Sequence, residues 1–255
     1  MNRYRPIVCL FAVFALSCEG QNKIEVPRAR QAARLEPAQT HSKAEGIEGL
    51  TATLPDGASL RYTISLPRGY DKQKPVPLVM ALHYGGNVTP FYGRGVIEGL
   101  VGPAFADLGA IIVAPDAQGD SPWTSEKNEQ AVIWLTQNVM KTHSINPKKI
   151  VLTGFSMGGE GTWYIGSRHQ DLFTAAIPVA GRPAGGKDWK IPVYAIHSRK
   201  DEVVPIGPAE EHVKALKAKG ASVEWKVLTD LTHFETARYQ DALRQAAGWL
   251  QQSWK

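Results

Sequence analysis

One serine has the neighbours that nucleophilic chemistry needs. Residues 154–159 are Gly-Phe-Ser-Met-Gly-Gly, so Ser156 has a glycine two positions before it and another two positions after it. The apolar run Ile150–Thr153 precedes this motif and a helical pattern follows it, which is the setting of a nucleophile at a strand-to-helix turn. Small neighbours are needed because the turn is tight, and the start of the helix offers free N–H groups to a developing negative charge. A glycine-rich turn in which the serine only caps the helix is the alternative.

A serine hydroxyl is a weak nucleophile, so it needs a base, and the base needs an acid that fixes its tautomer. In this kind of sheet the expected chain order is Ser, then Asp or Glu, then His, each in a loop after a strand. Asp201 follows the apolar run Val193–His197, and His233 follows Val223–Leu228. Both therefore lie at the carboxyl ends of consecutive strands, on the same edge as Ser156. We predict Ser156, Asp201 and His233 as a catalytic triad.

The other acids and histidines suit these roles less well. Glu202 and Asp230 could substitute for Asp201, but Asp201 has the better position before the turn at 203–205. His197 ends a strand and is predicted to be a core histidine. Three further histidines fall on predicted helices and are expected to be solvated: His143, His169 and His212.

Acyl transfer develops an oxyanion that needs two N–H donors. One is the N–H of Met157, the residue after the serine, and the second should come from a loop after an early strand. The apolar run Val76–Leu82 leads into a His-Tyr-Gly-Gly-Asn loop, so Gly85 or Tyr84 is the predicted second donor. A glycine turn that merely closes the strand explains the two glycines equally well.

Two loops offer material for the walls of a substrate site. They are 87–102, which contains Tyr92, and 118–125, which contains Trp123. We predict that Trp123 and Tyr92 bind substrate by holding an aromatic acyl group or a sugar ring, with simple packing as the alternative. The segment 181–190 is too short to form a large lid over the predicted site.

These residues must be positioned by a larger framework. From Gly49 onward, short apolar runs alternate with helical patterns, which predicts a mainly parallel sheet with helices on both faces. An antiparallel edge hairpin is expected from the first two of eight strands, which are Thr51–Leu54, Leu60–Leu66, Val76–His83, Ala110–Ala114, Ile150–Thr153, Ala175–Ala180, Val193–His197 and Val223–Leu228. The expected helices are Ile97–Leu108, Glu126–Thr142, Gly159–Arg168, Pro208–Lys219 and Thr236–Gln251.

Composition excludes several classes of chemistry. The 255 residues are 43% hydrophobic and 21% charged, which is ordinary for a globular protein. The net charge of +5 comes without a basic stripe, so nucleic-acid binding is not predicted. Because the two cysteines are Cys9 and Cys18, the body of the chain has no disulfide, cysteine nucleophile or cysteine zinc site. No metal ion or organic cofactor is expected.

The N-terminus has the pattern of an export signal. Arg3 and Arg5 precede the apolar run Ile7–Leu16, which at about 15 Å as a helix is too short to span a bilayer. The run ends in Ala-Leu-Ser-Cys18, which resembles a bacterial lipobox. We predict a lipoprotein-type signal peptide over 1–18 with Cys18 as the lipid acceptor, and a flexible tether over 19–45; ordinary cleavage after Gly20 is the alternative. The protein is then exported, either lipid-anchored in the cell envelope or free in the periplasm or outside, and it meets membrane only through that anchor.

The body of the chain, from about Leu54 to Trp249, resembles the α/β-hydrolase fold. Within that fold it is similar to the bacterial carboxylesterase/phospholipase-type and feruloyl or polyhydroxybutyrate esterase-like group. The motifs that carry the resemblance are Asp56-Gly57, Leu66-Pro67-Arg68-Gly69-Tyr70-Asp71, Leu82-His83-Tyr84-Gly85-Gly86, Gly154-Phe155-Ser156-Met157-Gly158-Gly159, Asp201-Glu202-Val203-Val204-Pro205 and His233-Phe234. Tyr84 departs from the usual His-Gly pair of the group, and Thr232 from the frequent glycine before the histidine.

The resemblance implies an α/β-hydrolase catalytic domain over 46–255, with an eight-stranded sheet and no large lid. It also implies a serine hydrolase that cleaves carboxylic esters, with short acyl or hydroxycinnamoyl groups, through an acyl-enzyme. The substrate would be a small molecule or an ester linked to a polysaccharide. A serine peptidase or thioesterase on the same fold is the alternative, and a non-catalytic binding module is the second. The sequence does not indicate an oligomeric state.

Overall fold

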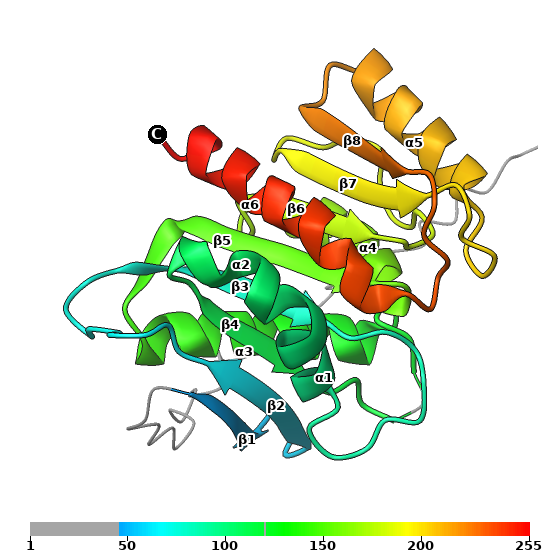
Figure 1. Cartoon of the computed structure of the whole chain (residues 1–255). Helices are drawn as coiled ribbons and strands as arrows, with labels where there is room; N and C mark the ends of the chain where they lie inside the picture. Colours follow the sequence, from blue (N-terminus) through cyan, green and yellow to red (C-terminus); the bar gives the residue numbers. More distant parts are fainter. Residues whose placement is uncertain (1–45, 120) are drawn as a thin grey trace, which may run out of the picture. The chain divides into compact units, whose positions relative to one another are not determined.

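The computed structural model describes residues 46–119 and 121–255 (Figure 1). The predicted signal peptide (1–18) and tether (19–45) lie outside these residues and remain predictions. The described part of the chain carries one eight-stranded sheet with helices on both faces, so the predicted fold class is confirmed. Within it, no helix combines the length and the apolar character that crossing a bilayer requires.

The strands follow one another across the sheet in the order β1-β2-β4-β3-β5-β6-β7-β8. Their bounds are β1 Ile47–Thr53, β2 Ser59–Ser65, β3 Val76–Leu82, β4 Ile111–Pro115, β5 Ile145–Phe155, β6 Ala175–Val179, β7 Val193–Ser198 and β8 Val223–Leu228. β2 is antiparallel to both β1 and β4, and every later pair is parallel. The predicted hairpin therefore forms one edge of the sheet and β8 forms the other.

The helices cover both faces of this sheet. The α-helices are α1 Gly93–Val96, α2 Gly102–Phe105, α3 Glu126–Thr142, α4 Met157–Arg168, α5 Ile206–Ala218 and α6 Gln240–Ser253. A π-helical turn η1 covers Ile97–Val101, and two short 3₁₀ helices are η2 Ala106–Leu108 and η3 Thr236–Tyr239. α3 has the predicted bounds, and Ser125 caps it by accepting the Asn128 N–H at 3.4 Å.

The single helix predicted over Ile97–Leu108 is wrong, because that segment is divided between η1, α2 and η2. The Gly102 N–H donates to the Ile97 carbonyl, which closes a turn one residue wider than that of an α-helix. A Cβ on Gly102 would lie 2.6 Å from the same carbonyl oxygen. Pro103 then has no N–H for the next helical bond, so a regular helix cannot run through this point.

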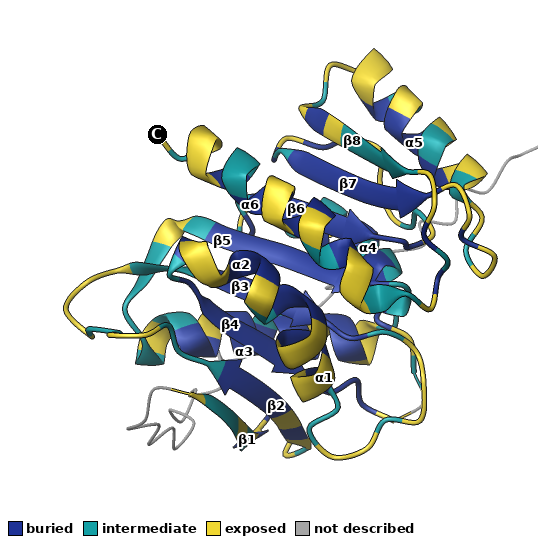
Figure 2. Ribbon diagram, viewed as in Figure 1, coloured by how far each residue is buried: buried dark blue, intermediate teal, exposed yellow. Residues whose placement is uncertain are grey.

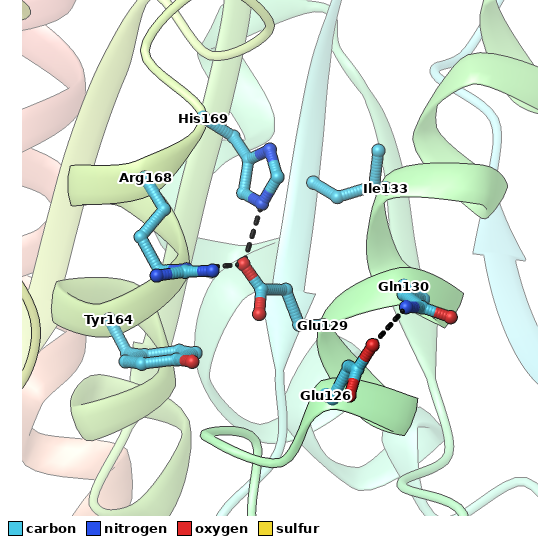
Figure 3. A pocket seen from close by; sticks show the side chains of 7 residues that line it. All are labelled: Glu126, Glu129, Gln130, Ile133, Tyr164, Arg168 and His169. Carbon is cyan, nitrogen blue, oxygen red and sulfur yellow. Dashed lines mark hydrogen bonds and ion pairs between the residues drawn. The ribbon is translucent and has the colours of Figure 1, made fainter. Parts of the chain in front are cut away.

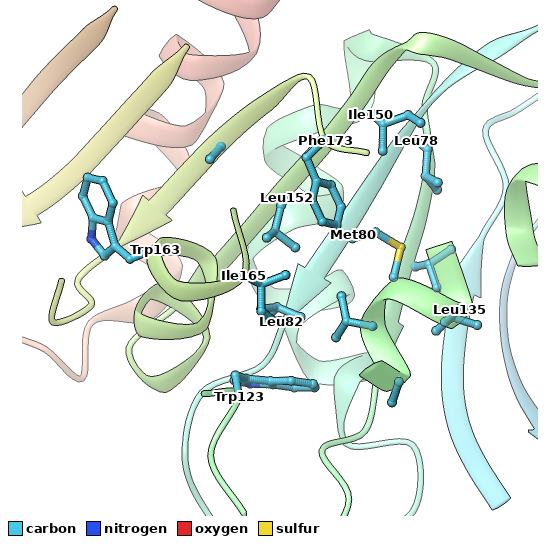
Figure 4. Close-up of a cluster of buried hydrophobic side chains, with 14 of the residues drawn as sticks. Leu78, Met80, Leu82, Trp123, Leu135, Ile150, Leu152, Trp163, Ile165 and Phe173 are labelled. Carbon is cyan, nitrogen blue, oxygen red and sulfur yellow. The ribbon is translucent and has the colours of Figure 1, made fainter. Parts of the chain in front are cut away.

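Two apolar layers hold the sheet from either side. Leu78, Met80 and Leu82 of β3 pack into one layer, and Val79 and Ala81 pack into the other. The first layer also contains the buried faces of α3 and α4 (Figure 4) and that of α5, and the second contains those of α1, η1, α2 and α6. Figure 2 shows the central strands buried and the outer helix faces exposed. Burial of one leucine contributes about 1.5–3 kcal/mol, so these layers fix the strand ends firmly.

The loops after β3, β5, β7 and β8 leave the sheet at its carboxyl edge, because those strands are parallel. They carry the predicted oxyanion loop, Ser156, Asp201 and His233. The connection 181–190 between β6 and β7 holds no helix or strand, which agrees with the predicted lack of a large lid.

Candidate active site

Ser156 occupies a strained turn between β5 and α4. Its backbone angles are φ 57° and ψ −117°, a combination that L-residues seldom adopt and that costs about 1–3 kcal/mol. The turn is held because the Ser156 N–H donates to the Val179 carbonyl at 2.9 Å, while the Ser156 carbonyl accepts the Glu160 N–H at 2.9 Å. A Cβ on Gly154 would overlap the Gly158 carbonyl, and one on Gly158 would overlap the Leu82 carbonyl. The glycines are thus required by backbone packing.

Three side chains from three loops form a hydrogen-bonded chain. His233 Nε2 lies 2.8 Å from Ser156 Oγ, and His233 Nδ1 lies 2.8 Å from Asp201 Oδ2. The other carboxylate oxygen of Asp201 accepts the N–H groups of Val203 at 3.0 Å and Val204 at 2.7 Å. Asp201 and His233 are buried, and Ser156 is half-buried. The structure therefore brings the three predicted residues together with the imidazole in the tautomer that accepts a proton at Nε2.

The two acids that could have replaced Asp201 have other partners. Glu202 Oε2 accepts the His233 backbone N–H at 3.1 Å, so this carboxylate joins the acid loop to the histidine loop. Asp230 is 63% exposed and pairs with Arg238 at 3.1 Å. The part played by Glu202 was missed by sequence reasoning, because it depends on a contact between residues 31 positions apart.

His197 is a buried histidine beneath the acid loop. It is 1% exposed, its Nε2 donates to the Val204 carbonyl at 2.8 Å, and it lies 3.5 Å from Asp201 Oδ2. Burial lowers the pKa of His197 and keeps the ring neutral. The expectation that His212 is solvated is wrong: it is 8% exposed and packs edge-on against Trp163, because α5 turns this face toward the first apolar layer.

Free N–H donors lie beside the serine. Among the described residues, the backbone N–H groups of Met157, Tyr84 and Gly85 have no protein acceptor. Met157 is the first residue of α4, and Gly85 lies so that a Cβ on it would be 3.9 Å from the Met157 side chain. Donors at a helix start and in an adjoining glycine loop suit a developing oxyanion.

A buried histidine holds the loop that contains Gly85. His83 Nδ1 donates to the Tyr84 carbonyl at 2.7 Å, and its Nε2 accepts the Ala117 N–H at 2.9 Å. The Trp123 indole N–H donates to the His83 carbonyl at 2.8 Å. Burial lowers the pKa of His83, so the ring is neutral and keeps this tautomer. The only signal for this role in the sequence was a histidine that directly follows a buried strand.

The two aromatic residues predicted to bind substrate differ in their exposure. The prediction that Trp123 lines the site is wrong, because its side chain is 1% exposed and packs in the core against Gly161. Tyr92 is half-buried and meets the Tyr84 ring edge-on at 5.7 Å. Asp116 fixes the backbone on either side of Tyr92 by accepting the N–H groups of Phe91 at 2.7 Å and Gly93 at 3.1 Å. Substrate binding by Tyr92 remains a prediction.

Two surface cavities lie apart from these residues. One of about 450 Å³ opens between α3 and α4 and is lined by Glu126, Glu129, Gln130, Ile133, Tyr164, Arg168 and His169 (Figure 3). Glu129 Oε1 there accepts bonds from Arg168 at 2.6 Å and His169 at 2.7 Å. The other, of about 470 Å³, lies beside β1, η1 and α2. Neither is lined by the serine, the histidine or the acid, and residues 46–119 and 121–255 contain no cluster of His, Cys, Asp and Glu that could hold a metal ion.

Comparison with known proteins places the site in a family. A sequence model of the dienelactone hydrolase family matches residues 100–253, which include Ser156, Asp201 and His233. Feruloyl esterase C of Emericella nidulans is 28% identical over 152 residues, which are 57% of this chain and 56% of that protein. Feruloyl esterase D of Neurospora crassa is 26% identical over 174 residues, which are 59% and 56% of the two chains.

A solved structure of an esterase is similar in fold. The crystal structure of a thermostable esterase is similar with a TM-score of 0.68 and 25% identity, over 81% of this chain and 62% of that one. The chain spans about half the length of the two feruloyl esterases. Against the putative carboxymethylenebutenolidase of Salmonella typhi, to which it is 24% identical over 257 residues, it spans 91% of that protein.

Proposed function

Because the chain belongs to the dienelactone hydrolase family, we propose that it hydrolyses carboxylic esters with Ser156 as nucleophile. The observation that carries the proposal is the hydrogen-bonded chain from Ser156 Oγ through His233 to Asp201 at a strained strand-to-helix turn. A serine hydroxyl becomes nucleophilic when a base takes its proton, and His233 Nε2 lies 2.8 Å from Ser156 Oγ.

The reaction would run in two steps. His233 Nε2 takes the proton of Ser156 as Oγ attacks the ester carbonyl, and the same nitrogen then gives that proton to the leaving alcohol oxygen. Asp201 holds the Nδ1–H and stabilises the imidazolium. Water, deprotonated by His233, attacks the acyl-enzyme, which releases the acid and restores the serine.

The oxyanion would be held by the N–H groups of Met157 and Gly85. The argument for Gly85 over Tyr84 comes from the peptide group that joins them. In a trans peptide the C=O and the N–H point in opposite directions, so His83, by holding the Tyr84 carbonyl, turns the Gly85 N–H away from itself. Gly85 is exposed, and a Cβ on it would lie 3.9 Å from the Met157 side chain.

For the acyl group, we propose short acyl or hydroxycinnamoyl esters, free or attached to polysaccharide. Two considerations support this. The connection 181–190 carries no lid that could cover a long acyl groove. Two relatives are named feruloyl esterases. A peptidase or a thioesterase would use the same three side chains, so the test includes both substrate types.

The first prediction concerns Ser156→Ala. The full chain is expected to release p-nitrophenol from short-chain p-nitrophenyl esters and ferulate from methyl ferulate, and the variant to lower turnover by on the order of 10⁴. Initial rates across acetate to laurate, with acetylated xylan, a peptide anilide and an acyl thioester in the same panel, provide the measurement. Ser222→Ala, which changes an exposed serine away from the turn, is the control. Retention of most activity in Ser156→Ala would contradict the assignment, and faster anilide or thioester cleavage would move the substrate class.

A further inference from the structure

Two large apolar side chains are exposed in the described part of the chain, and each comes one or two positions after a residue of the predicted triad in the sequence. Phe234 is 77% exposed and directly follows His233, and Val203 is 47% exposed two positions after Asp201. Scattered exposed apolar residues need no explanation. Here both lie on the loops that carry the acid and the base, so exposed apolar surface adjoins the candidate site.

A ring contact places Phe234 beside the base, and a backbone hydrogen bond places Val203 beside the acid. The Phe234 ring meets the His233 ring edge-on, with centroids 5.8 Å apart and planes at 86°. The Val203 N–H donates to Asp201 Oδ1 at 3.0 Å. Glu202 binds the His233 backbone N–H at 3.1 Å and so ties the two loops together. Phe234 and Val203, here called the apolar rim, therefore stand in a fixed relation to the base.

The chemistry of the proposed reaction decides which half of the ester meets this rim. The carbonyl oxygen must face the N–H of Met157 at the start of α4. The alcohol oxygen must face His233 Nε2, which returns the proton to it as the C–O bond breaks and the electron pair stays with that oxygen. Because Phe234 packs on the His233 ring, the rim adjoins the alcohol and not the acyl group.

We propose that the apolar rim binds the alcohol half of the ester, and that this alcohol is a ring with a flat apolar face, either an aryl group or a sugar ring. This inference rests on the proposed ester hydrolysis. A single exposed phenyl ring offers a flat surface for ring-on-ring contact. Because Phe234 is 77% exposed, its ring presents an open surface on which a flat ring could lie.

The test compares acetates that share an acyl group and differ in the alcohol. The full chain and Phe234→Ala are assayed on phenyl acetate, on a singly acetylated methyl xyloside and on ethyl acetate. For each substrate, kcat/KM of the variant is divided by kcat/KM of wild type, so that the intrinsic reactivity of the ester cancels. We expect kcat/KM to fall by about five- to tenfold for at least one ring alcohol, mainly through KM, and to change less than about twofold for ethyl acetate. The two ring substrates decide between an aryl and a sugar alcohol.

Matched variants separate a contact with substrate from a disturbed base. Phe234→Tyr keeps the ring and should keep the preference, and Val203→Ala should cause a smaller loss of the same kind. Lys200→Ala alters an exposed side chain on the acid loop outside the rim and should have no effect. Since Phe234 is 77% exposed, the melting temperature of Phe234→Ala should equal that of wild type.

Three results would overturn the inference. The first is that Phe234→Ala lowers kcat/KM for ethyl acetate as much as for the ring substrates. The second is that it lowers kcat/KM for neither ring substrate. The third is that the loss in kcat/KM differs between phenyl acetate and phenyl butyrate, which share the alcohol and differ in the acyl group. Failure of the proposed function looks different, because wild type would then cleave none of these esters or Ser156→Ala would cleave them as well as wild type.

Discussion

His83 is the residue whose job is least visible in the sequence. Its ring accepts the Ala117 N–H and donates to the Tyr84 carbonyl, so it links the loop after β3 to the loop after β4. A protonated ring would present a second donor to the Ala117 N–H, and burial prevents this by lowering the pKa of His83. The ring therefore acts as a fixed strut behind the proposed oxyanion donor Gly85, and it touches no reacting atom.

A prediction at this scale follows for His83→Phe. Loss of the bond to the Tyr84 carbonyl frees the Tyr84–Gly85 peptide to rotate, so kcat on p-nitrophenyl acetate should fall by about 10- to 100-fold with KM nearly unchanged. The variant loses two hydrogen bonds in all, those of the ring to the Tyr84 carbonyl and from the Ala117 N–H, which should cost about 1–3 kcal/mol of stability in urea unfolding. His83→Asn, whose amide can donate from a position close to Nδ1, should recover part of kcat. A stability loss without a kcat loss would show that His83 is only structural.

The three residues of the candidate site were predictable from sequence because chain order and turn spacing restrict them strongly. Ser156 is marked by its glycines, and Asp201 and His233 follow the last two predicted strands, Val193–His197 and Val223–Leu228. Sequence reasoning placed Trp123 wrongly and did not predict that Phe234 is exposed, for the same reason. Whether an aromatic side chain is buried depends on distant contacts, such as the bond from Trp123 to the His83 carbonyl 40 positions away.

At the scale of elements, the turn between β5 and α4 depends on close backbone approach. The carbonyls of Leu82 and His83 occupy the space that a Cβ on Gly158 would need. Relief would require the end of β3 and the loop after it to move away from α4. The β5–α4 turn and the proposed oxyanion loop are therefore one mechanical unit.

Gly158→Ala tests that coupling. We expect a loss of about 1–3 kcal/mol in urea unfolding, because the overlapping atoms belong to backbone, together with a large fall in esterase rate. Gly248→Ala is the matched control: it lies inside α6 with no atom within 4 Å of the added Cβ. Alanine there should stabilise the protein by about 0.5–1 kcal/mol and leave the rate unchanged. A Gly158→Ala protein with wild-type stability and rate would refute the steric argument.

Strands were easier to predict than helices for a physical reason. Buried parallel strands are continuous apolar runs, and each predicted run coincides with a strand of the sheet. β5 begins before its predicted start because its first half contains Pro147, Lys148 and Lys149 and so lacks an apolar run. The apolar residues of segment 97–108 recur with a helical period throughout, so their pattern predicts one helix. The Gly102-Pro103 pair divides the segment, and the apolar pattern contains no information about that pair.

At the scale of the whole molecule, histidines set how stability depends on pH. Burial lowers the pKa of His83, His143, His197 and His212 in the folded chain. Below an unfolded pKa of about 6.5 the unfolded chain binds more protons than the folded one, so stability rises with pH in that range. The loss of folding stability is absent above about pH 7, and it grows as the pH falls toward the lower pKa values of the folded chain.

The melting temperature is therefore expected to fall between pH 7.5 and 5, by about 2–4 °C for each kcal/mol lost. Scanning calorimetry in matched ionic strength measures this, and His212→Leu should flatten the profile because it removes one buried ring. Hydrogen bonds from Arg168 and His169 outweigh burial and lower the pKa of Glu129, so its contribution is lost only below about pH 4.5, outside this window. A melting temperature that rises on acidification would contradict the sign.

The bond between His233 Nε2 and Ser156 Oγ joins residues 77 positions apart, with β6, β7 and β8 between them along the chain. A growing or refolding chain can pair β3, β4 and β5 early, yet it has no working serine until the loop after β8 closes back onto the turn. Recovery of ester cleavage after dilution from denaturant should for this reason lag behind recovery of the far-ultraviolet helix signal. The return of ester cleavage thus reports the formation of the last contacts in folding and not the first.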